Sequence, residues 1–252
     1  MRYAAGVEYC GTNFHGWEVQ QPEIRTVQGE VERALSRVAN HFVRVTTAGR
    51  TDTGVHALAQ VIHFESGADR SDRSWLYGAN ANLPADVCLS WVRPVSDQFH
   101  ARFSAISRSY RYIIFNRPVR TAISRSERTW IYQPLDEQKM QLAANTLLGE
   151  HDFSSYRAVA CQAHTPVRTI HQLEVTRQGD EVWIEVRANA FLHHMVRNIA
   201  GVLISIGSGA HPPQWAQEVL DHRDRREGGV TAPPEGLSLI AVEYPQGAME
   251  WN

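Results

Sequence analysis

The sequence has little lysine, little cysteine and no long apolar run. The last two shortages each exclude a class of protein. Every one of its 25 basic residues except Lys139 is an arginine. The three cysteines, Cys10, Cys88 and Cys161, lie far apart and form no Cys-x-x-Cys motif, which argues against a disulfide framework or a zinc site. No apolar run reaches the roughly 18 residues that a membrane span needs. We therefore expect a cytoplasmic protein that makes no use of a membrane.

Motifs for cofactors and metals are also missing. No Walker A sequence occurs, and no Gly-x-Gly-x-x-Gly follows a predicted strand, so nucleotide cofactors have no support. The opening MRYAAGVEYC begins as a strand and lacks the regions of a signal peptide. His193 and His194 are neighbours in a predicted helix, where adjacent side chains point about 100° apart and cannot share one ion. We expect no cofactor and no metal.

The charge of the chain is balanced overall but uneven along its length. The formal net charge of the 252 residues is −2, which does not by itself indicate a nucleic-acid binder. Between residues 102 and 128, however, the only acid is Glu127, and seven arginines occur there: Arg102, Arg108, Arg111, Arg117, Arg120, Arg125 and Arg128. Arginine forks match phosphate oxygens well. This stretch is compatible with an RNA-backbone contact, and equally with a solvated arginine-rich surface.

Hydrophobic periodicity predicts an α+β fold in the first part of the chain. Alternation predicts strands, and a stripe of apolar residues with Thr26 as N-cap predicts the first helix. The predicted order is a strand over 3–9, a helix over 27–40, strands over 41–48 and 57–65, a helix over 74–83 and a strand over 87–95. This β-α-β-β-α-β order is the split βαβ pattern of ferredoxin-like domains.

The remainder predicts a second α+β half. It comprises a strand over 107–116, a helix over 135–148, a hairpin over 170–189, helices over 191–209 and 213–222, and a strand over 237–244. The hairpin is expected to turn at Gln178-Gly179-Asp180. We predict domains 1–105 and 106–252. No Pro/Gly linker separates them, which favours two rigidly joined halves that share a cleft.

One loop contains residues suited to catalysis. In AGRTDTGVHALAQVIHF (48–64), Asp52-Thr53-Gly54 matches the triplet of aspartic proteases. A protease dyad needs carboxylates that share a proton. Arg50, on the same side of an extended approach, would instead favour an ionised Asp52. An ionised aspartate can serve as a nucleophile or orient one. A plain polar turn remains the alternative, and His56 is expected to brace the loop by hydrogen bonding.

Several segments together resemble the bacterial tRNA pseudouridine synthase A family, which isomerises uridines in the anticodon stem-loop of tRNAs. The matching segments span nearly the whole chain: YCGTNFHGW (9–17), TVQGEVERAL (26–35), AGRTDTGVHALAQVIHF (48–64), HARFSAISRSYRYIIFN (100–116), EHDFSSYR (150–157), RTI (168–170), FLHHMVRNIAGVL (191–203) and APPEGLSL (232–239). The GRTDxGVHA stretch is the most specific of them. The resemblance implies a homodimer that acts on positions 38, 39 and 40 of tRNA without a cofactor or metal.

The resemblance also implies a role for individual residues. Asp52 corresponds to the catalytic aspartate, Tyr110 to the active-site tyrosine and Leu237 to a leucine of the uracil pocket. Arg197 matches an arginine that lies beside the aspartate and pairs with it, and Arg50 one that contacts RNA and helps displace the base. The implied fold has two ferredoxin-like or RRM-like α/β halves whose antiparallel sheets join around a central basic cleft.

Among the arginines of 102–128, those expected to bind RNA are Arg102, Arg108 and Arg111. Two departures from the family pattern leave RNA contacts open: Cys10 stands where an aspartate is common, and Glu18 where a glutamine is common. The rival from another class is a non-catalytic RNA-binding protein. The presence of Arg50, Asp52 and Tyr110 together argues against it, because a binder has no use for a carboxylate that faces phosphate.

Overall fold

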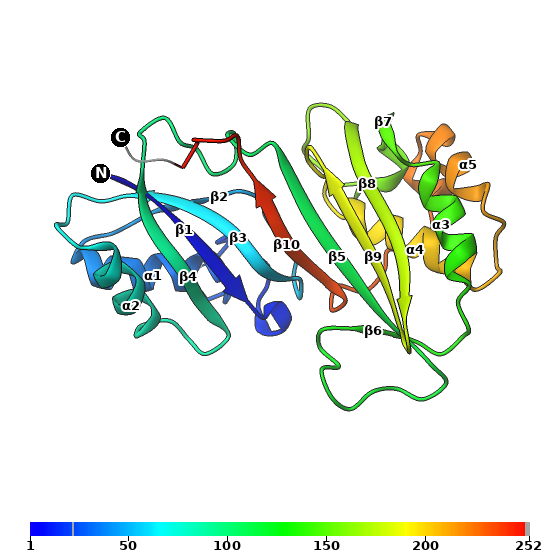
Figure 1. Cartoon of the computed structure of the whole chain (residues 1–252), viewed down its shortest axis with the longest axis horizontal. Helices are drawn as coiled ribbons and strands as arrows, with labels where there is room; N and C mark the ends of the chain where they lie inside the picture. Colours follow the sequence, from blue (N-terminus) through cyan, green and yellow to red (C-terminus); the bar gives the residue numbers. More distant parts are fainter. Residues whose placement is uncertain (22, 250–252) are drawn as a thin grey trace. The chain divides into compact units, whose positions relative to one another are not determined.

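The computed structural model describes residues 1–21 and 23–249, and the chain divides into two compact units (Figure 1). Unit 1 comprises Met1–Ser107 together with the C-terminal segment from Ser238 onward, and unit 2 comprises Arg108–Leu237. The first boundary lies close to the predicted one. The last segment differs from the prediction, because β10 (Leu237–Glu243) pairs in parallel with β3 (His56–Glu65) and so belongs to unit 1.

Unit 1 has the predicted β-α-β-β-α-β order. Its elements are β1 (Arg2–Tyr9), the short 3-10 turn η1 (Gly11–Asn13), α1 (Val27–Ala39), β2 (Val45–Thr47), β3, α2 (Asp72–Asn80) and β4 (Val87–Val95). β1 lies between β4 and β3 and is antiparallel to both, and β2 is antiparallel to β3. This arrangement places the start of β3, which follows the Asp52 loop, beside the end of β1.

Both faces of the sheet in unit 1 are covered. The Thr26 hydroxyl accepts the Gly29 N–H, and this cap starts α1 at the predicted position. On the helix side, Trp75 of α2 contacts Tyr3 and Phe64. On the other side, a second apolar cluster forms around Phe99, whose ring lies 5.0 Å from that of Tyr244. β1 is consequently buried on both faces and provides a rigid support for the loops at its end.

Unit 2 is a second antiparallel sheet with helices. Its elements are β5 (Ser107–Asn116), β6 (Thr129–Ile131), α3 (Glu137–Asn145), β7 (Gly149–Asp152), η2 (Ser154–Tyr156), β8 (Val167–Gln178), β9 (Glu181–Ala188), α4 (Met195–Gly207), α5 (Trp215–His222) and η3 (Arg225–Glu227). Neighbouring strands run in the order β5-β9-β8-β7, and β6 is parallel to β5. The β8–β9 hairpin turns at Gly179 (φ +60), as predicted. The fold class is α+β, as the sequence indicates.

Three local predictions were wrong or incomplete. The strand predicted over 41–48 is only β2, because the Val43 N–H donates to Ser36 Oγ of α1 and the chain there does not join the sheet. β6 and β7 were missed, since strands of three and four residues show no readable alternation. The helix predicted over 191–209 begins only at Met195. The backbone of His194 is in the left-handed conformation (φ 62), which a right-handed helix cannot include. In the described part of the chain, no helix combines the length and apolarity that crossing a membrane requires.

Candidate active site

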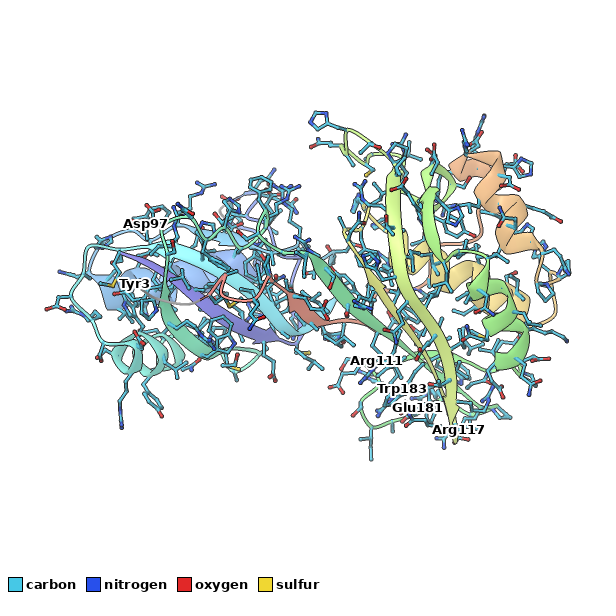
Figure 2. The ribbon with its side chains drawn as sticks, turned by 45° about the horizontal axis from the view of Figure 1, so that its top comes forward. Tyr3, Asp97, Arg111, Arg117, Glu181 and Trp183 are labelled. Atoms are coloured by element: carbon cyan, nitrogen blue, oxygen red, sulfur yellow. The ribbon has the colours of Figure 1, made fainter. Side chains whose placement is uncertain are left out.

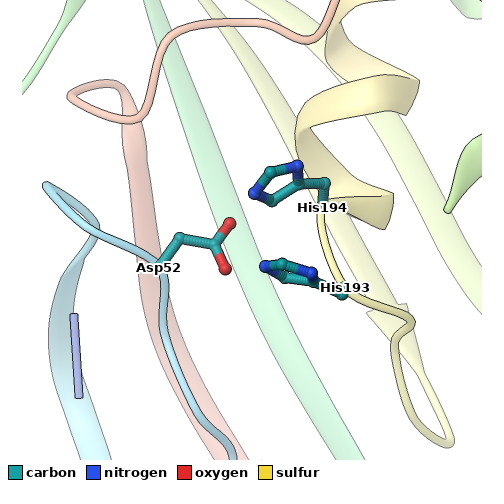
Figure 3. A group of neighbouring side chains, drawn as sticks. All are labelled: Asp52, His193 and His194. Atoms are coloured by element: carbon teal, nitrogen blue, oxygen red, sulfur yellow. The ribbon is translucent and has the colours of Figure 1, made fainter. Parts of the chain in front are cut away.

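Asp52 lies in the loop between β2 and β3 of unit 1 (Figure 3). Three backbone hydrogen bonds fix this loop. The Trp17 N–H donates to the Thr51 carbonyl (3.0 Å), the Gly54 N–H to that of Phe14 (3.3 Å) and the Val55 N–H to that of Asp52 itself (3.1 Å). Thr51 is buried and Asp52 is half-buried. The carboxylate is therefore presented from a backbone with little freedom to move.

Two glycines of the segment after β1 allow the Asp52 loop to approach so closely. A Cβ on Gly11 would lie 1.9 Å from the Val55 carbonyl oxygen. Gly16 adopts a left-handed φ of +86, and a Cβ there would lie 2.8 Å from the Thr51 carbonyl oxygen. The sequence prediction missed the role of this glycine pair. The only signal was the glycine punctuation of CGTNFHG.

Buried side chains complete the support of the loop. The Tyr9 hydroxyl lies 2.8 Å from Thr51 Oγ1, and Gln60 donates to the Gly49 carbonyl (2.6 Å). Burial raises the pKa of Tyr9 to about 12, so its phenol stays neutral and available for hydrogen bonding. His56 Nδ1 accepts the Gly11 N–H (3.0 Å), which is the bracing contact expected of this histidine.

Arg50 makes an ion pair with Glu18, a residue to which the sequence analysis gave no role. Its guanidinium contacts Glu18 Oε1 at 2.5 Å, and the two side chains are 60% and 45% exposed. The expectation that Arg50 favours an ionised Asp52 stays a prediction, and the printed ion pair of Arg50 is with Glu18. Side chains two residues apart in an extended segment point to the same side. A long side chain such as that of Arg50 can nevertheless turn toward another partner.

In unit 2, Tyr110 lies on β5 and is buried, with 7% of its surface exposed. Its ring meets the Phe191 ring edge-on, with the centroids 5.0 Å apart. Because side chains alternate along a strand, Tyr110 shares its face with Tyr112. The Tyr112 hydroxyl lies 2.6 Å from Thr129 Oγ1 and donates to the Pro233 carbonyl at 2.9 Å.

The segment 232–237 connects two of the predicted site residues, Arg197 and Leu237. Arg197 Nε donates to the Ala232 carbonyl (2.8 Å), and the Ala232 N–H donates back to the Arg197 carbonyl (3.1 Å). At the far end, the Leu237 N–H donates to the Pro234 carbonyl (2.9 Å). The Ile113 N–H of β5 donates to Gly236 (2.8 Å), so the segment also binds the strand that contains Tyr110. Arg197, Tyr110 and Leu237 thus belong to one framework within unit 2.

A close approach explains Gly236. A Cβ at this position would lie 2.7 Å from the Ile113 carbonyl oxygen and 2.8 Å from Thr129 Oγ1. No larger residue fits between β5 and the segment without moving one of them. Leu237, the next residue, is buried, and the close contact of Gly236 with β5 fixes the backbone from which its side chain extends.

The arginine-rich stretch carries less net charge than its local sequence suggested. Acids of β9 and the β8–β9 turn neutralise three of its members: Arg111 pairs with Glu185 (2.7 Å), Arg117 with Asp180 (3.5 Å) and Arg128 with Glu181 (2.5 Å). Arg111 also lies over the Trp183 ring, 4.3 Å from its centroid (Figure 2). A count along the sequence could not see partners some 50 to 75 residues away across a strand pair.

The other two predicted RNA-binding arginines differ in exposure. Arg108 is buried, with 8% exposed, and donates to the Asn189 carbonyl (3.0 Å). Arg102 is exposed in the loop after β4, near the ring of Phe103, which is itself 76% exposed. Of the three arginines expected to bind RNA, Arg102 is the most exposed to solvent.

His193 and His194 immediately precede α4 instead of lying in it (Figure 3). Their ring centroids are 4.1 Å apart. The argument that a helical spacing turns them away from each other was therefore wrong, because the left-handed backbone at His194 brings the rings together.

Comparison with known proteins defines the class. The family model described as tRNA pseudouridine synthase matches residues 5–104 and 143–245. The chain belongs to this family and is accordingly an enzyme of the isomerase class, a pseudouridine synthase that modifies tRNA.

Three similar relatives are each described as tRNA pseudouridine synthase A. The chain is 59% identical to the one from Coxiella burnetii (strain RSA 331 / Henzerling II) over 244 residues, which is 97% of this chain and 93% of that protein. It is 59% identical to that of Nitrosococcus oceani over 245 residues (97% and 94%) and 54% identical to that of Legionella pneumophila (strain Lens) over 246 residues (98% and 94%).

A solved structure described as "Crystal Structure of a Cbf5-Nop10-Gar1 Complex" aligns with a TM-score of 0.41 and 11% identity, covering 94% of this chain and 48% of that one. This similarity is too low to support a conclusion about the fold or the function of the chain.

Proposed function

We propose that the protein isomerises uridine to pseudouridine at positions 38, 39 and 40 of the tRNA anticodon stem-loop, with Asp52 as the catalytic residue. The observation that carries this proposal is the Asp52 loop, in which glycines and backbone hydrogen bonds hold one half-buried carboxylate within the Arg-Thr-Asp motif. Such fixation is what a catalytic group requires, because a rigid group needs no reorganisation in the transition state.

The reaction begins with extrusion of the target nucleotide. A uracil stacked inside RNA is inaccessible, and flipping it out costs a few kcal/mol. Contacts of Arg102 and Arg111 with phosphates offset this cost, whereas the buried Arg108 supports the end of β5, and Arg50 assists the displacement of the base. Asp52 then starts cleavage of the N1–C1′ bond by attack on the sugar, by attack on the base, or by abstraction of a sugar proton. The freed uracil rotates and rejoins the ribose through C5.

Tyr110 and Leu237 are proposed to bind the uracil ring, since stacking on a side chain stabilises a base by about 1–3 kcal/mol. The Tyr110 phenol helps remove the C5 proton as a general base, directly or through water. By resemblance to the family, Arg197 is assigned to bind the carboxylate of Asp52 during the reaction. The shared framework of Tyr110, Arg197 and Leu237 within unit 2 supports assigning the three to one task.

The reaction itself needs no cofactor, because the base never leaves and no group is donated. We further propose a homodimer that works in the cytoplasm, in keeping with sparse, unpaired cysteines and a tRNA substrate.

The experiment is to incubate the purified protein with an unmodified tRNA transcript and map pseudouridine at nucleotide resolution. The expected result is modification confined to positions 38–40 of transcripts that carry uridine there. A protein that retains the transcript without modifying it would be a binder only, and one that cleaves peptides and ignores tRNA would be a protease. Either result would refute the proposal.

A further inference from the structure

Glu18 has no place in the reaction described above, yet it makes the ion pair of Arg50. The distance from Arg50 Nη2 to Glu18 Oε1 is 2.5 Å. Both side chains are substantially exposed, so RNA can reach the pair from solvent. The inference drawn from this contact rests on the proposed function, because it concerns how Arg50 is held before RNA arrives.

The backbone on both sides of Glu18 is fixed. The Trp17 N–H donates to the Thr51 carbonyl (3.0 Å), which ties it to the Asp52 loop itself. The Val19 N–H donates to Gln28 Oε1 of α1 (3.2 Å), and Gln28 is buried. Gln28 is fixed in turn, since its amide donates to Glu32 (2.8 Å). The backbone that carries Glu18 is therefore fixed beside the Asp52 loop, with the carboxylate within reach of Arg50.

Two further features determine how this ion pair can act. Arg50 lies two residues from Asp52, close enough for a flexible guanidinium to seek that carboxylate. Pairing with Glu18 gives the guanidinium another partner on the same loop. Exposed ion pairs are also weak and screened by salt, so a phosphate group can displace the carboxylate.

We propose that Glu18 is a positioning residue, which holds the Arg50 guanidinium in the RNA-free protein and yields it to a phosphate of the tRNA backbone. The exchange replaces a carboxylate by a phosphate at the same guanidinium, whose fork suits both. Glu18, once released, stands beside the bound polyanion and takes up a cation from solution.

This exchange has a measurable salt signature. Each phosphate that a protein cation neutralises releases counterions and contributes about −0.9 to the slope of log K against log salt. In the wild type, the cation taken up by Glu18 offsets the release at Arg50. With glutamine at position 18 the offset disappears, because an amide neither neutralises Arg50 nor recruits a cation. The slope should become steeper by up to about 0.9.

The test measures equilibrium binding of unmodified tRNA at a series of salt concentrations. The control is Glu23→Gln, which removes the same charge from an exposed position of the same segment. At low salt, Glu18→Gln should bind about two- to fivefold more tightly than the wild type, beyond any effect of Glu23→Gln. Glu18→Asp keeps the charge and should retain the wild-type slope.

A double-mutant cycle isolates the contact with Arg50. In an Arg50→Gln background, Glu18→Gln should change affinity and slope no more than Glu23→Gln does, because no guanidinium remains to be held. Equal effects of Glu18→Gln and Glu23→Gln in the wild-type background would overturn the inference. So would an undiminished effect of Glu18→Gln in the Arg50→Gln background.

The two proposals fail in different ways. If the wild type forms no pseudouridine in unmodified tRNA, the proposed function fails. If the wild type is active and Glu18→Gln shows neither tighter binding nor a steeper slope than Glu23→Gln, only the role of Glu18 fails.

Discussion

The Asp52 loop of unit 1 and the 232–237 segment of unit 2 are both irregular, and they are held by different means. Backbone-to-backbone contacts made possible by Gly11 and Gly16 fix the Asp52 loop. The side chains of Tyr112 and Arg197 bind carbonyl groups of the 232–237 segment. An atom added at Gly11 or at Gly236 should therefore disturb the segment concerned, and the 232–237 segment should also respond to removal of the Tyr112 or Arg197 side-chain donor.

A second contrast concerns protons. In unit 1, the imidazole of His63 accepts the Ala101 N–H through Nδ1. In unit 2, the phenol of Tyr112 donates to a carbonyl, and burial raises the pKa of this phenol well above its usual value. An imidazole gains a proton as the pH falls, whereas a tyrosine keeps its proton there. The contact of His63 with the Ala101 N–H should therefore be lost in acid while the contact of Tyr112 with the Pro233 carbonyl remains.

Among the variants that test this comparison, the largest effect is expected from Tyr110→Phe, which removes only the phenolic oxygen from unit 2. The ring and its edge-on contact with Phe191 remain, so tRNA affinity should stay near that of the wild type. Loss of a general base should lower the turnover number by about 10²–10⁴-fold. Tritium release from 5-tritiated uridine in tRNA measures it. Normal turnover in this variant would assign the proton transfer to another group.

Gly11→Ala adds one carbon where the Val55 carbonyl oxygen would lie 1.9 Å away, and it should cost about 3 kcal/mol of folding free energy or prevent folding. Gly67→Ala is the matched control, because a Cβ there meets nothing within 4 Å. Denaturant unfolding compares the two variants. If both are equally stable, backbone proximity does not fix the Asp52 loop.

Lowering the pH tests the contrast in protons. Burial, with help from the nearby His100 and Arg2, lowers the pKa of His63 from 6.5 to about 4, although Glu65 opposes the shift. Between these values the unfolded chain binds the proton and the folded chain does not. The stabilising contribution is present above pH 6.5 and is lost as the pH falls toward 4.

The expected loss at His63 is up to about 3 kcal/mol across that range. Unfolding free energies measured from pH 7 to pH 4 should show it, and His63→Asn should flatten the dependence while keeping an acceptor for the Ala101 N–H. An unchanged pH dependence in His63→Asn would show that another group is responsible.

Tyr112→Phe should have the smallest effect, about 1–2 kcal/mol, because it leaves the Pro233 carbonyl without its donor. Loosening this tether should also raise the KM for tRNA by moving Leu237. The control Tyr132→Phe alters an exposed phenol and should change neither quantity. A KM for Tyr112→Phe equal to that of the control would show that the Tyr112 hydroxyl is not needed to hold the 232–237 segment.

The same contrast explains what the sequence could predict. Regular elements with clear periods, such as α1 and the β8–β9 hairpin, were predicted closely, as was the β-α-β-β-α-β order. Bracing of the Asp52 loop by His56 was predicted from its position in the motif. The Arg50–Glu18 pair was missed, because it joins separate segments through side-chain geometry that has no period. The acids opposite Arg111 and Arg128 were missed for the same reason: strand pairing, not sequence distance, determines electrostatic neighbours.

The central claim is that one carboxylate, that of Asp52, initiates the isomerisation. The most direct measurement is the single-turnover rate of tritium release by Asp52→Asn with saturating enzyme, alongside its affinity for the same tRNA. An amide has nearly the shape of the carboxylate and none of its charge, so we predict normal binding and a rate at least about 10³-fold below the wild type. A rate near that of the wild type would contradict the account.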